Sequence, residues 1–321
     1  MDIVKNLSAL PLQVSDVAAA RARILAHVPP SPIDSALSLG PHVWLKLDCL
    51  LPTHSFKVRG ALNAMLSLDD DAKARGVIAA STGNHAQGIA YAARLSGVSA
   101  RIVMPTNAAR RKIAGVEHYG GQPILFGASY DDAETEARRI ERDEGLTYLS
   151  PYNDVRVAAG QGVCGLELIE QVPTVERVIV PIGGGGLISG IAVALKSVRP
   201  DIEIIGVNAA VSPEMYNFFY AQDRPGSADT LADALPGMIE AGSITLEITR
   251  ALVDQIVLVS ERQISDAMRW LKTHHDIIGE GGGVVGIAAV LGGVIPLDKQ
   301  TVIVVSGGNV DEDVLARVLT T

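Results

Sequence analysis

A lysine, a run of glycines and two serine-containing turns are the parts of this chain whose residue types can do chemistry. Lys57 lies in the segment HSFKVRG, and four consecutive glycines begin at Gly183. A lysine amine becomes a nucleophile or a base once its charge is suppressed, and glycine-rich backbone before a helix binds anions. Taken alone, Lys57 is typical of a surface lysine, so the distant segments have to decide its role.

The segment GGGGLISG (183–190) stands between an aliphatic run and a helical pattern. Glycines let the backbone approach an anion closely, and the start of a helix adds free N–H groups and a favourable dipole. We therefore expect a phosphate here, because a close turn alone needs only one or two glycines. The spacing matches neither the dinucleotide fingerprint nor the phosphate loop that ends in Lys-Ser/Thr, so it does not indicate NAD or ATP.

Two other turns also follow aliphatic runs. In STGNH (81–85) the hydroxyls can hold a carboxylate, and the Asn84 amide can hold a phenolic or carbonyl oxygen. In SGGN (306–309) the Ser306 hydroxyl can hydrogen-bond a ring nitrogen without carrying a charge. Helix capping in the first turn and a plain strand-ending turn in the second are the open alternatives.

Together, an amine, a phosphate cradle, a carboxylate loop and a hydroxyl for a ring nitrogen describe one ligand. That ligand is pyridoxal phosphate joined to the lysine, with an amino acid beside it. The histidines do not form a metal signature, and the chain has neither GxSxG nor an ordered Ser/His/Asp set.

Eight short aliphatic runs predict the strands that must position these residues. The runs are 43–48, 76–81, 100–105, 122–127, 177–182, 203–208, 255–260 and 301–306. The stretches between them have helical patterns, and Ser129…Asp132 and Ser260…Gln263 predict capping boxes at two helix starts. Because ligands bind beyond the carboxyl ends of parallel strands, we expect all three loops on one edge of a sheet.

Alternation of strands and helices predicts an α/β protein, and 321 residues are enough for two domains. We expect each domain to be an open, mostly parallel twisted sheet with helices on both faces. The strand–helix units between about 70 and 147 indicate a small domain inserted in a larger one. We place the small domain, with the carboxylate loop, at 52–147 and the large cofactor-binding domain at 1–51 and 148–321.

Composition limits the partners and the compartment. The net charge of −9 argues against nucleic acid and anionic membrane, because both attract basic surfaces. Cys49 and Cys164 form neither a disulfide framework nor a zinc pattern, which favours a reducing, cytoplasmic compartment. The uncharged stretch 178–195 is interrupted by proline and glycines, so we interpret it as strand, loop and helix rather than a membrane span. The first residues show no signal-peptide pattern.

The motifs resemble those of the fold type II (β-family, tryptophan synthase β-like) pyridoxal phosphate enzymes, in particular the threonine/serine ammonia-lyase and serine racemase group. The resemblance covers nearly the whole chain and rests on six segments in matching order. These segments are HSFKVRGA, STGNHAQG, PYNDVRVAAGQG, PIGGGGL, EGGGVVGIAAVL and SGGN.

The resemblance implies a role for each matching residue. Lys57 would bind the cofactor as a Schiff base and, once freed by substrate, act as the base at the α-carbon. Thr82 would be the second catalytic position, and Ser306 would contact the pyridine nitrogen. The cofactor would be held by Phe56, Lys57, Asn84, Gly183, Gly184, Gly185, Gly186, Leu187, Glu280 and Ser306. The substrate would be held by Ser55, Ser81, Thr82, Gly83, Asn84 and His85.

The implied reaction is elimination of water from L-threonine or L-serine, which gives a 2-oxo acid and ammonia. Because a hydroxyl at Ser306 does not force protonation of the ring nitrogen, it suits departure of a β-hydroxyl. The chain stops soon after SGGN, so we expect the short, catabolic form without a regulatory domain. The alternatives are a serine racemase, a lyase for 3-hydroxyaspartate or a hydroxyectoine-derived amino acid, and a non-catalytic cofactor-binding protein.

Thr82 and Asn208 depart from the pattern of this group. Racemases carry a serine at the position of Thr82, which keeps a hydroxyl, so racemisation stays an alternative. Racemase-like members begin a divalent-cation site with a carboxylate where this chain has Asn208, followed by Glu214. We therefore expect no metal ligands, with a divalent cation as the open alternative. The group also implies a homo-oligomer, a dimer or a tetramer.

Overall fold

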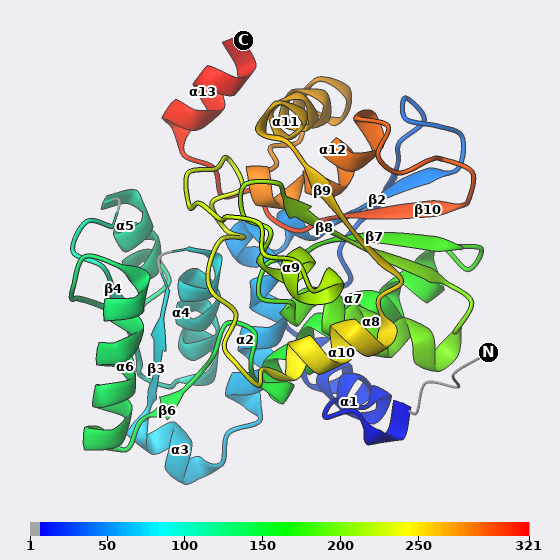
Figure 1. Ribbon diagram of the computed structural model, residues 1–321. Coiled ribbons are helices and arrows are strands. Elements are labelled where there is room, and N and C mark those ends of the chain that lie inside the picture. The colour runs from blue at the N-terminus through cyan, green and yellow to red at the C-terminus, as the bar shows by residue number, and fades with distance from the viewer. Residues whose placement is uncertain (1–6, 82, 109, 321) are drawn as a thin grey trace.

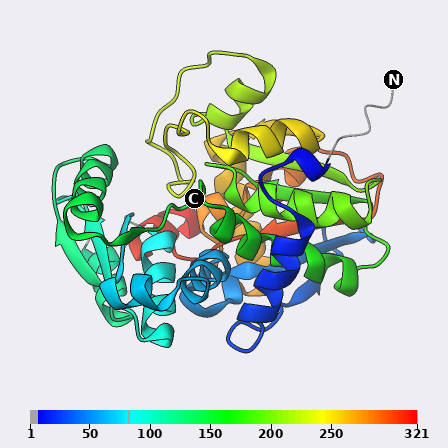
Figure 2. The same cartoon turned by 90° about the horizontal axis from the view of Figure 1, so that it is seen from below.

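The computed structural model describes residues 7–81, 83–108 and 110–320, which form two sheets with helices around them (Figure 1). The four-stranded sheet and its helices lie to one side of the six-stranded sheet, as the view from below also shows (Figure 2). The protein is therefore an α/β structure built on two separate sheets.

The six-stranded sheet has the order β1-β2-β10-β7-β8-β9. Only β1 runs antiparallel, against β2, and the other neighbours are parallel. Its strands are β1 (Ile33–Ser35), β2 (Val43–Leu47), β7 (Arg177–Pro181), β8 (Glu203–Ala209), β9 (Gln255–Val259) and β10 (Thr301–Val305).

The four-stranded sheet is parallel throughout and has the order β5-β4-β3-β6. Its strands are β3 (Val77–Ala80), β4 (Ala100–Met104), β5 (Gln122–Leu125) and β6 (Thr147–Tyr148). Helix α6 packs on one face of this sheet and α4 on the other.

The helices follow the strands in the alternating order that parallel sheets require. In the first half of the chain they are α1 (Val14–Ile24), α2 (Lys57–Leu66), α3 (Asp70–Arg75), α4 (Asn84–Ser96), α5 (Arg110–His118), α6 (Tyr130–Glu144) and α7 (Val155–Gln171). In the second half they are α8 (Gly186–Val198), α9 (Glu214–Tyr220), α10 (Ile244–Leu252), α11 (Glu261–His275), α12 (Val285–Leu291) and α13 (Glu312–Thr320). None of the helices in the described part of the chain is long and apolar enough to cross a membrane.

Both faces of the six-stranded sheet are buried, and most side chains of its central strands are aliphatic. In β10, Val302 and Val304 join the core that contains α7 and α8, whereas Ile303 and Val305 join the core that contains α11 and α12. Side chains alternate between the faces of a strand, so a strand that is covered on both faces has no polar side.

Helix α2, which begins with Lys57, crosses α7 at a contact between glycines. A Cβ on Gly60 would lie 2.6 Å from the Val157 carbonyl oxygen, and a Cβ on Gly160 would lie 2.6 Å from the Arg59 carbonyl oxygen. Real Cβ atoms do not approach other atoms this closely, so only glycine permits the observed separation. The position of α2 is therefore fixed by backbone against backbone.

A fully buried ionic cluster lies two residues further along α2. The Arg59 guanidinium donates to both carboxylate oxygens of Asp48 at 2.9 Å and to those of Glu167 at 2.6 and 2.8 Å. Lys46 donates to Glu167 at 2.5 Å and to the Ser31 carbonyl oxygen at 2.8 Å. Although burial raises the pKa of Asp48, the Arg59 guanidinium brings that pKa below its usual value. Every charge in the cluster is thus paired.

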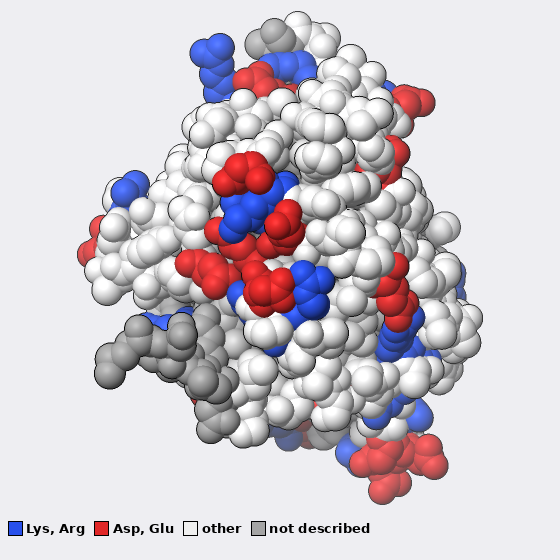
Figure 3. Space-filling model, turned by 90° about the vertical axis from the view of Figure 1, so that its right-hand side faces the viewer, with Lys and Arg blue, Asp and Glu red and all other residues white. Residues whose placement is uncertain are grey.

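Other ion pairs lie at the end of the large sheet at which its parallel strands begin. Arg177 pairs with Glu203 at 2.7 Å and with Asp298 at 2.8 Å, and Lys299 pairs with Glu203 at 2.9 Å. Figure 3 shows this face, on which positive and negative side chains are mixed. The mixture leaves no strongly charged surface of one sign there.

All eight predicted strands are confirmed, and so are the capping boxes at Ser129 and Ser260. The stretch 178–195 is strand, loop and helix, as expected. The expectation of a single sheet edge is wrong. STGNH follows β3 in the small sheet, whereas the loops after β7 and β10 belong to the large sheet. The three loops meet because the two sheets face one cavity, which a pattern along the chain does not reveal.

Candidate active site

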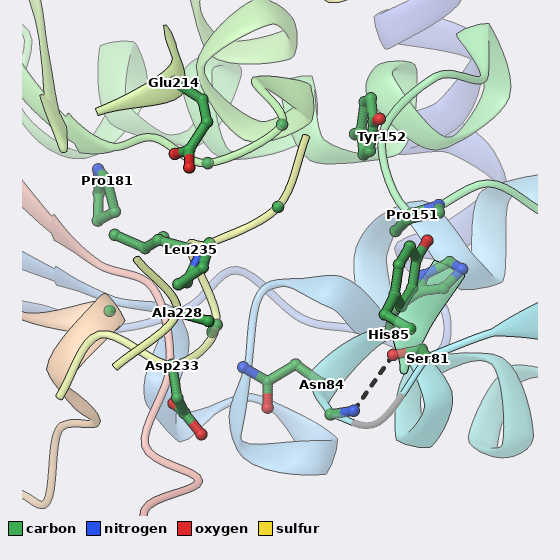
Figure 4. Close-up of a pocket in the computed structure, with 18 of the residues that line it drawn as sticks. Ser81, Asn84, His85, Pro151, Tyr152, Pro181, Glu214, Ala228, Asp233 and Leu235 are labelled. Atoms are coloured by element: carbon green, nitrogen blue, oxygen red, sulfur yellow. Dashed lines mark hydrogen bonds between the residues drawn. The ribbon is translucent and has the colours of Figure 1, made fainter. Parts of the chain in front are cut away.

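A cavity of about 1110 Å³ lies between the two sheets. Lys57, the glycine loop after β7, the loop after β3 and Ser306 all line it, although they come from four distant parts of the chain. Figure 4 shows Ser81, His85 and Pro151 on one side of this pocket and Pro181, Glu214 and Leu235 across from them (Figure 4). The predicted segments are therefore brought together in space.

Lys57 is the first residue of α2, and its Nζ donates to the Pro151 carbonyl oxygen at 2.8 Å. Burial lowers the pKa of Lys57 to about 8, and the opposing influence of Glu280 does not cancel it. The Phe56 ring lies beside the amine, with 5.1 Å between Nζ and the ring centroid. A large fraction of Lys57 is therefore neutral near pH 8, the state that a nucleophile or base requires.

The loop from Gly183 to Leu187 has the properties of an anion cradle. Gly185 has φ +86°, which favours glycine, and α8 begins one residue later. Among the described residues, no backbone acceptor is bonded to the N–H groups of 183–187. A Cβ on Gly184 would lie 2.5 Å from Cδ1 of Tyr152, so a side chain at this position would collide with the ring. These free donors at a helix start can bind a phosphate.

The loop after β3 places Ser81, Gly83 and His85 on the cavity wall. The Gly83 N–H donates to Ser81 Oγ at 3.2 Å, which is the contact dashed in Figure 4. His85 Nε2 lies 2.9 Å from the Leu149 carbonyl oxygen, so Nε2 carries a proton and donates it. Burial and the nearby Lys57 lower the pKa of His85 to about 3, which keeps the imidazole neutral. Thr82, predicted as catalytic, lies outside the described residues.

Asn84, Glu280 and Asn309 form a connected polar group at the cavity wall. Asn84 Nδ2 donates to Glu280 Oε1 at 2.6 Å, and Asn309 Nδ2 donates to Asn84 Oδ1 at 2.8 Å. Burial raises the pKa of Glu280 to about 8, with Asp233 adding to the effect. Asn309 was not singled out from the sequence, although it is the last residue of the SGGN segment.

Ser306 follows β10 and is buried against the cavity, and its hydroxyl makes no side-chain hydrogen bond to another described residue. Its carbonyl oxygen accepts from the Phe56 N–H at 2.9 Å, which ties the segment before α2 to the end of β10. Ser55 pairs with Gly307 through an isolated bridge, is fully buried and is not among the residues that line the cavity. Among the described residues that were predicted to bind substrate, Ser55 alone does not line the cavity.

Residues 221–243, which contain neither helix nor strand, cover part of the cavity. In Figure 1 this segment is the yellow-green to yellow stretch of chain between α9 and α10. Lys112 of α5 pairs with its Asp233 at 3.0 Å, and the Glu240 N–H donates to Tyr152 Oη at 3.0 Å. Asn153 Nδ2 also donates to Glu240 Oε2 at 2.6 Å. These contacts were not expected from the sequence because the segment carries no recognisable pattern.

Asn208 has both ends of its amide occupied. Nδ2 donates to the Ile182 carbonyl oxygen at 2.5 Å, and Oδ1 accepts from the Tyr216 N–H at 3.0 Å. Glu214 accepts from the Ser212 hydroxyl at 2.7 Å. Within the described ranges, no three His, Cys, Asp or Glu side chains are grouped as metal ligands. The Asn208 amide is therefore committed to main-chain partners on both sides.

The donor set does fit pyridoxal phosphate. The glycine loop offers unpaired N–H groups to a phosphate, and its lack of side chains leaves room for one. Lys57 offers an amine of lowered pKa to an aldehyde, and Ser306 offers an uncharged hydroxyl to a ring nitrogen. Each functional group of the cofactor finds a matching partner in one cavity.

The comparison with known proteins gives the same class. Residues 24–307 match the family described as pyridoxal-phosphate dependent enzyme, so the chain belongs to this family and its cofactor is pyridoxal phosphate. The chain is 43% identical over 286 residues to the L-threonine ammonia-lyase of Thermotoga maritima, a match that covers 87% of this chain and 70% of that protein.

It is also 38% identical over 312 residues to the catabolic L-threonine dehydratase of Escherichia coli K12, with 94% of each protein covered. Among solved structures, maize serine racemase is similar, with a TM-score of 0.89, 34% identity and coverage of 96% of this chain and 97% of that chain. The fold type II assignment and the resemblance to the ammonia-lyase and racemase group are confirmed.

Proposed function

We propose that the protein is a pyridoxal phosphate-dependent ammonia-lyase that eliminates water from L-threonine or L-serine. The observation that carries the proposal is the Lys57 amine, which has a lowered pKa and faces the same cavity as an anion cradle and Ser306. The names of the two relatives above, an ammonia-lyase and a dehydratase for L-threonine, support the choice of reaction.

Pyridoxal phosphate, when bound, withdraws electrons from the α-carbon of an amino acid and so makes its proton acidic. The N–H groups of the loop from Gly183 to Leu187 would hold its phosphate, and the Asn84 amide would donate to its phenolic oxygen. Lys57 removes the proton from the substrate α-carbon, and its pKa of about 8 leaves more of the amine neutral than an ordinary lysine would have at the same pH. The Ser81 hydroxyl and the main-chain N–H groups of Gly83 and His85 hold the substrate carboxylate, since the neutral His85 ring donates its one proton to Leu149.

Ser306 determines how much charge the ring nitrogen takes up. A hydroxyl can donate to or accept from that nitrogen, whereas a carboxylate would favour its protonation. With Ser306 as the partner, the bound cofactor would draw less charge into its ring, which would favour departure of the β-hydroxyl. The choice of serine therefore favours elimination.

The test is to incubate purified protein with a panel of hydroxy-amino acids and to measure 2-oxo acid and ammonia. We expect equimolar release from L-threonine, L-serine or both. Failure to release a 2-oxo acid from any β-hydroxy-amino acid would contradict the proposal, because the predicted products are the direct measure of the reaction.

Serine racemisation is the second candidate, and the similarity to maize serine racemase is the observation that favours it. The two reactions share the removal of the α-proton, after which the β-hydroxyl leaves in the lyase and a proton returns to the opposite face in the racemase. Chiral chromatography after incubation with L-serine distinguishes them, because D-serine forms only in the racemase reaction. A product ratio dominated by D-serine would replace the lyase assignment.

We infer further that residues 52–147 form a small domain and that residues 1–51 and 148–321 form the large one. The placement of β3, β4 and β5 in their own sheet supports this division. The buried thiols of Cys49 and Cys164, which are both free, support a cytoplasmic location. A homo-oligomer, a dimer or a tetramer, is the assembly we propose, and sedimentation of the holoenzyme tests it.

A further inference from the structure

We propose that Asn309 is a positioning residue whose amide fixes the orientation of the Asn84 amide, so that Asn84 presents an N–H to the cofactor. The inference rests on the proposed function of the cavity, because it assumes that the oxygen facing Asn84 belongs to pyridoxal phosphate. Asn84 projects from the start of α4 into the pocket, as Figure 4 shows.

The main-chain oxygen of Thr53 fixes the orientation of the Asn309 amide. Asn309 Nδ2 donates to the Thr53 carbonyl oxygen at 2.8 Å, and a carbonyl oxygen can only accept. Reversing the Asn309 amide would place two acceptors face to face. The Thr53 carbonyl is itself held by a backbone with φ +68°, a conformation that costs a β-branched residue free energy and needs support from its surroundings. The amide of Asn309 is therefore fixed from outside the cavity.

The Asn309 amide in turn fixes the orientation of the Asn84 amide. The second hydrogen of Asn309 Nδ2 is donated to Asn84 Oδ1 at 2.8 Å. With Oδ1 committed to Asn309, the Nδ2 end of Asn84 must face the other way. There it donates one hydrogen to Glu280 Oε1 at 2.6 Å. An amide has two N–H bonds, so one remains for a ligand.

Glu280 supports the same orientation from the opposite side. Its Oε2 accepts from the Asn309 main-chain N–H at 3.1 Å, while Oε1 accepts from Asn84. Gly307 allows this approach, because a Cβ there would lie 2.2 Å from Glu280 Oε1. Asn84 is thus oriented by an acceptor, Glu280, on one side and a donor, Asn309, on the other.

The orientation of Asn84 decides whether a hydrogen-bond donor or an acceptor faces the cofactor. In the observed orientation Asn84 offers a hydrogen-bond donor to the phenolic oxygen. If the amide reversed, a carbonyl oxygen would face that oxygen, and two acceptors would repel each other. Asn309 therefore acts through Asn84 and is not required to touch the cofactor.

The test replaces the donor of Asn309 by an acceptor of equal size. We expect N309D to raise the dissociation constant of the cofactor about tenfold, as loss of a buried hydrogen-bond partner typically does, and to shift the absorbance maximum of the bound cofactor. N309A, which removes the group without inverting its polarity, should have the smaller effect. Asn63→Asp is the matched control, because its buried amide donates to the Arg156 carbonyl oxygen and lies outside the cavity lining.

A double-mutant cycle separates this role from a general loss of stability. In an Asn84→Ala background, N309D should cause no further loss of cofactor affinity, because the group through which it acts is gone. Independent, multiplicative losses would overturn the proposal, and so would an N309D protein with unchanged affinity and absorbance. Both measurements concern cofactor binding, so their outcome does not depend on which hydroxy-amino acid is the substrate. They can therefore contradict this proposal while the 2-oxo acid assay supports the proposed function, or the reverse.

Discussion

Lys57 and Arg59 lie two residues apart in the first turn of α2, yet their surroundings are opposite. Arg59 has a partner for every charged contact it makes. Burial alone would lower its pKa, but Asp48 and Glu167 outweigh burial and raise the pKa well above the usual value. Lys57 has one carbonyl oxygen as its hydrogen-bond partner, and burial lowers its pKa to about 8. The same helix thus carries one cation whose charge is fully stabilised and one whose charge is not.

The difference explains why Lys57 is reactive and Arg59 is not. A buried charge without a counter-ion is unstable and tends to lose its proton, which makes an amine reactive. A buried charge with good partners is inert, and it fixes the elements that it joins. Here the inert cluster joins α2 to η2 (Asp48–Leu50) and α7, so the stabilised cation holds the reactive one in place.

Removing the reactive cation should have the largest effect. Lys57→Ala should lower 2-oxo acid release by at least about a thousandfold, because the base at the α-carbon is lost. Borohydride reduction followed by mass spectrometry should find the cofactor attached to the wild type and not to the variant. Lys73→Ala, at a partly exposed position of α3 outside the cavity, is the control and should behave as the wild type. Full activity in Lys57→Ala would refute the assigned mechanism.

Breaking the inert cluster should affect stability first. Arg59→Met leaves the Asp48 and Glu167 carboxylates buried without their partner, so we expect the free energy of unfolding to fall by about 3–5 kcal/mol. Urea denaturation of the holoenzyme measures it. Arg199→Met, which breaks an exposed pair with Asp201, should leave the midpoint nearly unchanged. Equal midpoints for the two variants would show that burial does not distinguish the pairs.

The comparison extends to glycines of similar conformation in different places. Gly185 in the cradle has φ +86° and Gly97 at the end of α4 has φ +66°, so alanine strains either backbone by about 1–3 kcal/mol. Gly185→Ala should also weaken cofactor binding, measured by equilibrium dialysis, whereas Gly97→Ala should lower only the melting temperature. A loss of cofactor affinity in Gly97→Ala would mean that strain alone accounts for the effect.

The pKa of Lys57 gives the finest test of the comparison. The rate at which apo-protein takes up cofactor should rise with pH and level off above about pH 8, since the neutral amine is the nucleophile. An unperturbed lysine would keep rising to about 10.5. Because Glu280 raises the pKa of Lys57, Glu280→Gln should move the midpoint to lower pH. A midpoint that stays in place or moves upward would show that Glu280 does not act on Lys57.

Much of the fold was predictable because aliphatic runs predict buried strands directly. The missed strands, β1 and β6, have three and two residues and contain IDS and TY, which carry no hydrophobic pattern. The capping boxes at Ser129 and Ser260 were predictable because their contacts span three residues. Interactions between residues close in sequence can be recognised from the sequence pattern, whereas the strand order within each sheet cannot.

The same distinction applies to the site. Lys57, the glycine loop and Ser306 could be recognised because each lies in a motif whose residue types suit one chemical group. The roles of Asn309 and Arg59 could not, because Asn309 meets Asn84 across 225 residues and Arg59 meets Glu167 across 108. Such pairs exist only after folding, and a single sequence gives no measure of their proximity.

The glycine contact between α2 and α7 has a consequence for how this protein can change. Where two helices meet through side chains, a substitution on one can be offset by repacking on the other. At Gly60 and Gly160 main chain meets main chain. Although the Gln161 side chain also reaches Gly60, the carbonyl oxygens of Val157 and Arg59 cannot be repacked, so even one methyl group must separate the helices. Substitutions in the loops that cover the cavity can therefore change the substrate preference, while the Lys57 amine stays in the same position.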